Sequence, residues 1–132
     1  MQKNILHGIL TGVFSGLGCY FFYYILKEEF MYDFTKIISP INIFGTTMFS
    51  ALLASIGHYF LLKFSAKYGD RIFNSLFGIF VLISLVFPML HKLPLEFDEY
   101  LTVIFPTYAM TMHFIPFLFW FMLKPFFFKD EK

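Results

Sequence analysis

Four long apolar segments set what this chain can fold into. A helix needs about 20 mostly apolar residues to cross a hydrocarbon core about 30 Å thick. Because lipid offers no hydrogen-bond partners to the backbone, each segment should be helical. The sequence therefore predicts an all-α, polytopic membrane protein, an antiparallel bundle of four transmembrane helices forming a single membrane domain over residues 1–132. The predicted spans are Ile5–Leu26, Asn42–Phe64, Ile72–His91 and Tyr100–Leu123, and their one charged residue is Lys63.

The composition points to the same class and excludes others. Hydrophobic residues make up 58% of the chain and charged residues 14%, against about 25% charged in globular domains. A net charge of only +1 does not indicate a strongly basic surface, so no nucleic acid is expected as a partner. Cys19 is the only cysteine, which leaves no CxxC or cysteine-rich metal motif. No pattern of catalytic residues stands out, so we expect neither an enzyme nor a metal site.

The basic residues predict the orientation. Four spans put both ends of the chain on one side, and short loops rich in Lys and Arg stay in the cytoplasm. The side that holds both ends carries seven of the ten basic residues, and the other side carries three. We therefore expect a protein of the plasma (inner) membrane with cytoplasmic N- and C-termini and membrane lipids around it. The seven are Lys3, Lys63, Lys67, Arg71, Lys124, Lys129 and Lys132, and the three are Lys27, Lys36 and Lys92.

The connections differ in length. Residues 65–71 are few enough to make the second and third spans a hairpin, with Gly69-Asp70 as the turn. Residues 92–99 also form a short link. The longer segment Lys27–Ile41 mixes aromatic and charged residues, a pattern that predicts an interfacial helix. Pro40 is a helix-start signal for the second span.

Small residues recur every fourth position in the first span. Gly8, Gly12 and Gly16 would let another backbone approach closely, which is how helices associate in lipid. The second span offers a matching stripe of Ser50, Ala54 and His58, flanked by Ala51, Ser55 and Gly57. The simplest hypothesis pairs these two helices within one chain. The alternative is a homo-oligomer through the glycine face.

Each span also carries one histidine, which raises two hypotheses. Paired imidazoles on neighbouring helices could ligate haem b, but the estimated depths leave no two histidines level, so no cofactor is the favoured expectation. A polar pocket could instead gather Thr11, Ser15, His58 and His113, either as a ligand site or as interhelical hydrogen bonds. The remaining two, His7 and His91, are expected at the membrane interfaces.

The fourth span carries Pro106 and Pro116, which predict kinks. Tyr100 and Trp120 lie near its two ends and are expected to act as interface anchors. With the glycine spacing, Ser84-Leu85-Val86-Phe87-Pro88 and Met112-His113, the chain resembles an uncharacterised family of small four-helix integral membrane proteins. This resemblance implies the architecture and no activity.

Two classes of function follow from these features. The favoured one is a non-enzymatic membrane protein that acts through helix–helix contacts, as a subunit or partner of a membrane complex; an immunity-type protein against a pore-forming toxin would be one example. Its partner would be another membrane protein or a second copy of the chain. The alternative is a small transporter, channel or haem-binding redox subunit that uses His58 and His113.

Overall fold

Four helices make up almost all of the structure, a computed structural model that describes residues 1–90 and 99–128. They are α1 (Gln2–Glu28), α2 (Pro40–Phe64), α3 (Gly69–Leu90) and α4 (Glu99–Phe127). Of the described residues 86% are helical, and none of them lies in a strand. The helical content confirms the all-α part of the prediction. All four helices are also long and apolar enough to cross a membrane. Outside the described residues lie His91, the connection at 92–98 including Lys92, and the tail positions Lys129 and Lys132.

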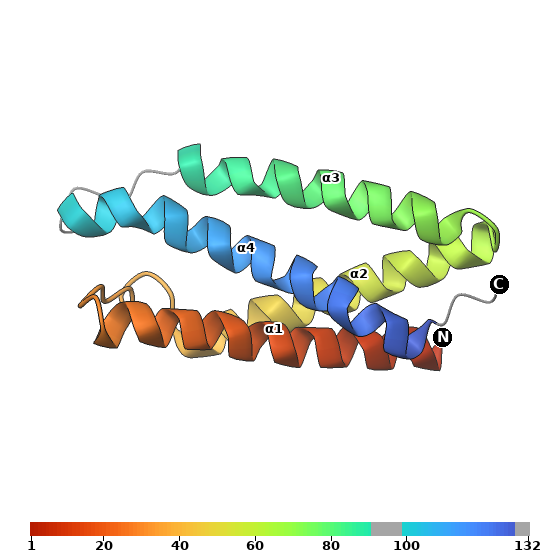
Figure 1. Ribbon diagram of the computed structural model, residues 1–132, viewed down its shortest axis with the longest axis horizontal. Coiled ribbons are helices and arrows are strands. Elements are labelled where there is room, and N and C mark those ends of the chain that lie inside the picture. The colour runs from red at the N-terminus through yellow and green to blue at the C-terminus, as the bar shows by residue number, and fades with distance from the viewer. Residues whose placement is uncertain (91–98, 129–132) are drawn as a thin grey trace.

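Successive helices run in opposite directions (Figure 1). α1 packs on α2 and α4, and α3 packs on the other side of the same two helices. Within the described chain, α1 and α3 do not touch. One end of the bundle therefore holds the start of α1, the connection between α2 and α3, and the end of α4.

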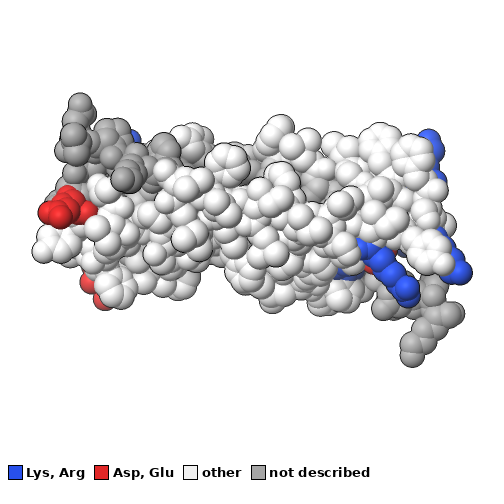
Figure 2. All heavy atoms as spheres, turned by 90° about the horizontal axis from the view of Figure 1, so that it is seen from above, with Lys and Arg blue, Asp and Glu red and all other residues white. Residues whose placement is uncertain are grey.

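Charged side chains gather at the two ends of the bundle (Figure 2). Most of the Lys and Arg in this view lie at one end, most of the Asp and Glu lie at the other, and the surface between them is uncharged. We call the two ends the basic end and the acidic end. The basic end carries Lys3, Lys63, Lys67, Arg71 and Lys124, and the acidic end carries Glu28, Glu29, Asp33 and Glu99.

The glycine stripe of α1 packs against α2 of the same chain. A Cβ built on Gly8 would lie 2.7 Å from the Cβ of Ser55, and one built on Gly12 would lie 2.9 Å from the Cα of Met48. A Cβ built on Gly16 would lie closer still, 2.5 Å from the ring of Phe44 on α2. The stripe is therefore used inside the monomer, which is the simpler of the two pairings that the sequence suggested.

Two members of the predicted stripe on α2, Ser50 and Ala54, are off its buried face by one position, whereas the third, His58, lies on it. Ser50 is exposed and donates a hydrogen bond to the Thr47 carbonyl, while Ala54 is only partly buried. Neighbouring residues on a helix point about 100° apart, so a shift of one position changes the face that is buried. The buried face of α2 consists of Ile43, Thr47, Ala51, Ser55 and His58.

Local signals explain where α2 and α3 begin. The Ser39 hydroxyl accepts a hydrogen bond from the Asn42 amide, and Pro40 is the first residue of α2, as predicted. Gly69 begins α3 rather than forming the turn, which lies at residues 65–68. A Cβ on Gly69 would collide with the backbone of Leu61, so the close approach of the two helix ends requires glycine there.

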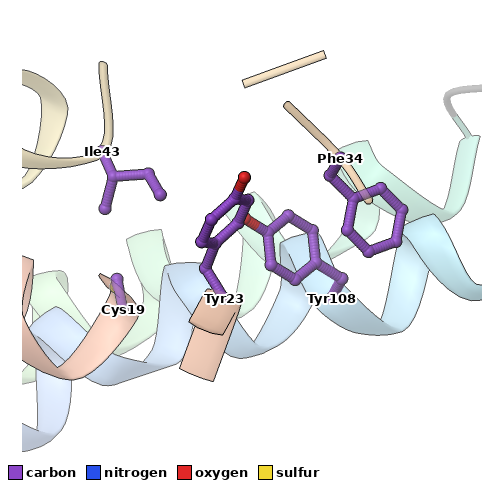
Figure 3. Close-up of a cluster of buried hydrophobic side chains, with 5 residues drawn as sticks. All are labelled: Cys19, Tyr23, Phe34, Ile43 and Tyr108. Carbon is purple, nitrogen blue, oxygen red and sulfur yellow. The ribbon is translucent and has the colours of Figure 1, made fainter. Parts of the chain in front are cut away.

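The connection between α1 and α2 is not the predicted interfacial helix. It turns inward and buries Phe34 completely, with the Phe34 ring stacked on Tyr108 at 4.4 Å between centroids (Figure 3). Asp33 supports this turn by accepting hydrogen bonds from the amide and hydroxyl of Thr35. Burying an aromatic ring is favourable by about 1.5–3 kcal/mol, which explains why the segment folds inward.

Candidate functional site

A hydrogen-bonded polar network lies at the basic end and centres on Asp70, in the first turn of α3. The Nζ atom of Lys124 lies 2.7 Å from one carboxylate oxygen of Asp70 and 2.8 Å from the other. The same lysine donates to the side-chain oxygen of Asn74 at 2.9 Å. His58 completes the set, with its Nε2 2.8 Å from the Asp70 carboxylate. These contacts tie α2, α3 and α4 together.

His58 extends the network to α1. Its Nδ1 lies 2.9 Å from the side-chain nitrogen of Asn4, and its ring is fully buried. An amide nitrogen can only donate, so Nδ1 accepts, and Nε2 carries the proton that is donated to Asp70. The ring is therefore the neutral Nε2–H tautomer. We call Asn4, His58, Asp70, Asn74 and Lys124 the His58 network; it joins all four helices.

Sequence reasoning found one member of this network and missed four. The sequence places Asp70 in a turn and Lys124 in the cytoplasmic tail, and its spacing singles out neither Asn4 nor Asn74. The positions of Asp70 and Lys124 in the sequence do indicate that they can pair, because each borders an apolar segment at the same end of the bundle. A charged residue that close to a span needs a partner or water.

His7 and Trp120 also differ from expectation. Both side chains are fully buried between the helices, whereas residues that anchor a helix at the membrane surface are expected to be exposed. The Nε2 of His7 lies 3.1 Å from the Trp120 carbonyl oxygen, and the two rings are 4.2 Å apart. The cause is helix length: α1 begins at Gln2 and α4 continues to Phe127, so both residues lie deeper in the bundle than the predicted span ends implied.

The predicted pocket of Thr11, Ser15, His58 and His113 is not formed. His113 is exposed and hydrogen-bonds the Ala109 carbonyl of its own helix at 2.8 Å. The His58 ring lies 5.7 Å from the Trp120 ring, which follows His113 by about 10 Å along α4. Depths counted from the predicted ends placed these histidines too close together. Thr11 and Ser15 are both buried, and of these two only Thr11 shares a cavity with His113.

That cavity measures about 560 Å³ and lies mainly between α2, α3 and α4. Its walls are mostly apolar, with Phe77, Phe80, Val81 and Phe117 among them. The hydroxyls that α2 contributes are bonded to carbonyls of their own helix. By contrast, Thr11 Oγ1, Tyr108 OH and Trp120 Nε1 have no hydrogen-bond partner within the described chain.

The two sites differ in what they can do chemically. Both ring nitrogens of His58 are bonded to protein groups, so ligation of haem by His58 would break the contact to Asn4 or to Asp70. Within residues 1–90 and 99–128, no three His, Cys, Asp or Glu side chains are grouped to hold a metal ion. Ser55, next to this network, already donates its hydroxyl to the Asn4 carbonyl. The contacts of the His58 network therefore join helices, and the cavity is a separate, mostly apolar space.

No family model matches this chain, and neither a curated protein nor a solved structure is significantly similar to it. The resemblance to an uncharacterised four-helix family therefore stays a prediction.

Proposed function

We propose that this chain is an integral membrane protein that crosses the plasma membrane four times, with both termini in the cytoplasm. The observation that supports this placement is the uncharged belt between the basic and acidic ends (Figure 2). The basic end would face the cytoplasm, where Lys and Arg are retained. The network of His58, Asp70 and Lys124 would then lie near the cytoplasmic edge of the bilayer.

Reporter fusions test this orientation. A reporter joined after Lys132 should be active in the cytoplasm, and the same reporter inserted within residues 92–98 should be active outside. Activity on the same side at both positions would refute the four-span arrangement.

We further propose that the protein has no enzymatic activity and acts through helix–helix contacts, as a subunit or partner of another membrane protein. The observation that carries this proposal is the outer face of α3, which packs only on α2 and α4. The remainder of α3 presents a row of large exposed apolar side chains, namely Leu76, Ile79, Phe80, Ile83 and Phe87. A homo-oligomer through Gly8, Gly12 and Gly16 is less favoured, because α2 already covers these glycines. An immunity-type protein remains one example of this class.

Photo-crosslinking distinguishes a protein partner from lipid at this face. A photoreactive amino acid at Ile83 should give a defined protein adduct in native membranes. The matched control is Phe21, an equally exposed position on α1, where lipid adducts alone are expected. Lipid adducts alone at both positions would exclude a partner at the α3 face.

A second candidate, a small transporter or channel, has one observation in its favour, the cavity that His113 lines. His58 does not line this cavity, so the alternative no longer depends on the two histidines acting together. Solute flux into vesicles that contain the purified protein, abolished by a bulky residue at Ala109, would favour transport over the partner role.

A further inference from the structure

His113 lies at the middle of α4 with its imidazole ring exposed. At 1.5 Å per residue it is about 21 Å from either end of the helix. Exposed residues that follow it on α4, Phe114 and Leu118, are apolar. In the membrane placement proposed above, this is the depth at which a polar side chain is most costly. An ionisable side chain in such a position indicates a binding role, and the groups around it indicate what it binds.

The His113 ring offers one free hydrogen-bond acceptor. Its Nδ1 lies 2.8 Å from the Ala109 carbonyl oxygen, and because a carbonyl can only accept, Nδ1 carries the proton. In the neutral ring the lone pair is then on Nε2, which makes no hydrogen bond to any residue of 1–90 or 99–128. Nε2 is therefore a basic nitrogen that lacks a proton donor.

Two serine hydroxyls lie at the same depth as His113. Ser50 on α2 and Ser84 on α3 are, like His113, about 21–23 Å from the basic end. Their hydroxyls donate to carbonyls of their own helices, Ser50 to Thr47 and Ser84 to Val81, but a hydroxyl can rotate to donate to a ligand instead. All three side chains line the cavity of about 560 Å³, and none of them is buried. Three helices therefore present polar groups at one level of this cavity.

The rest of the cavity suits a hydrocarbon chain. α2 and α3 spread apart from the basic end toward the acidic end (Figure 1), and both contribute to the cavity walls. The walls include Phe77 and Phe117, whose ring centroids are 5.7 Å apart. The lining residues on α4 run from Phe105 to Trp120, about 22 Å along the helix. Among the described residues that line the cavity none carries a carboxylate, and His113 is the only one with a basic side chain.

A carboxylic acid satisfies these groups better than other ligand classes. A cation would meet a basic nitrogen and no carboxylate, and burying a charge without a partner is costly. An ester has no proton to give to Nε2. A carboxylic acid brings one strong donor for Nε2 and oxygens that can accept from Ser50 and Ser84.

We propose that the cavity binds a free fatty acid, with the carboxyl group at His113 and the chain along α4. The acid would enter as its neutral form and donate its O–H proton to Nε2. If the proton transfers, a carboxylate lies beside an imidazolium, so the pair has no net charge in the apolar cavity. Phe80 and Ser50 line the cavity and are exposed, so the acid can enter from the surface of the bundle.

Trp120 is the only tryptophan and lines the cavity, so bromine atoms on a bound chain should quench its fluorescence. The full chain in detergent micelles is titrated with dibromostearic acid, its methyl ester and the corresponding dibromo-amine. We expect saturable quenching by the acid, at a concentration at least tenfold below that needed for either other probe. Equal quenching by all three probes would overturn the proposal, and so would saturation by the amine alone.

His113→Phe keeps a ring at this exposed position and removes both nitrogens. It should weaken the acid at least tenfold, to the affinity of the ester, and should leave the ester within twofold. A side chain that only shapes the cavity would change the affinity of both probes equally. That result, or an unchanged affinity for the acid, would show that Nε2 does not recognise a carboxyl group.

A second pair of variants separates binding in the cavity from contact at the surface. Ser84→Phe places a ring in the cavity and should weaken the acid at least tenfold. The control, Ile83→Phe, adds the same ring at the next position, which is exposed and does not line the cavity, and should stay within twofold. Equal affinities would contradict a site in the cavity, and His113→Phe decides the question if Ser84→Phe does not fold. These measurements in detergent require neither the proposed orientation nor a protein partner, so they can fail while the fusion and crosslinking experiments succeed.

Discussion

The Nε2 atom of His58 lies 2.8 Å from a carboxylate oxygen of Asp70, twelve residues further along the chain. The contact crosses the connection between α2 and α3, where Gly69 lets the two helix ends approach. Because Lys124 binds the same carboxylate from α4, the negative charge of Asp70 is balanced within the bundle. The geometry favours a structural role, in which one carboxylate fixes the relative positions of three helices.

Asp70→Asn should lower the free energy of unfolding by about 1.5–3 kcal/mol, the range for hydrogen bonds that involve a charged group. The amide keeps the shape of the side chain but removes the charge that Lys124 requires. Thermal unfolding in detergent measures the effect. Asp33→Asn is the matched control, since Asp33 pairs with Lys27 at an exposed site and such pairs contribute about 0–1 kcal/mol. Equal losses in the two variants would rule out a special role for Asp70.

Gly12→Ile should lower the free energy of unfolding by about 1–3 kcal/mol, because the new side chain would overlap the α2 backbone at Met48. The control is Gly45→Ala on α2, where a Cβ would meet no atom within 4 Å. There we expect no loss, or a gain of up to about 1 kcal/mol from helix propensity. Measured unfolding midpoints that match between the two variants would mean that the α1–α2 contact is looser than described.

His58→Gln and His113→Gln should have separate effects on stability. The first removes at least one hydrogen bond of the buried network, at about 1–2 kcal/mol, while the second changes an exposed side chain and should cost less than about 0.5 kcal/mol. Groups this far apart should add within about 0.5 kcal/mol in the double variant. A larger interaction energy in the double-mutant cycle would mean that His58 and His113 share one pocket, contrary to the structure.

The pKa of Asp33 should respond to Thr35. Hydrogen bonds from the Thr35 hydroxyl and amide hold the pKa of this carboxyl below its ordinary value of 3.8. The folded state thus favours the carboxylate, and the stability this provides is present above the unfolded pKa and is lost as pH falls through the lowered, folded pKa. Thr35→Val removes the hydroxyl and should raise the pKa. An NMR titration of the Asp33 carboxyl measures the shift, and an unchanged pKa would contradict the turn geometry around Phe34.

The sequence predicts the helices well because their cause is local. Apolar length alone identifies the four helices, and the Ser39-Pro40 pair marks a helix start. The residues of α2 that face α1 are harder to predict, because the choice between Ser50 and Ala51 depends on how the helix is rotated about its axis. The His58 network could not be read from spacing, since Asn4, Asp70 and Lys124 meet only when the helices are assembled. Likewise, the burial of Trp120 depends on the extension of α4 beyond its apolar segment.

The arrangement of the His58 network also sets an order during biosynthesis. Lys124 follows Asp70 by 54 residues. At the usual rate of about 5–20 residues per second, the ribosome takes about 3–11 s to make that stretch. During this interval α1 and α2 are complete and α3 is being made, while the Asp70 carboxylate still lacks its partner Lys124. Water at the bilayer edge can solvate this carboxylate until α4 is made. We therefore expect α1, α2 and α3 to pack loosely at first and to become fixed in position when α4 binds.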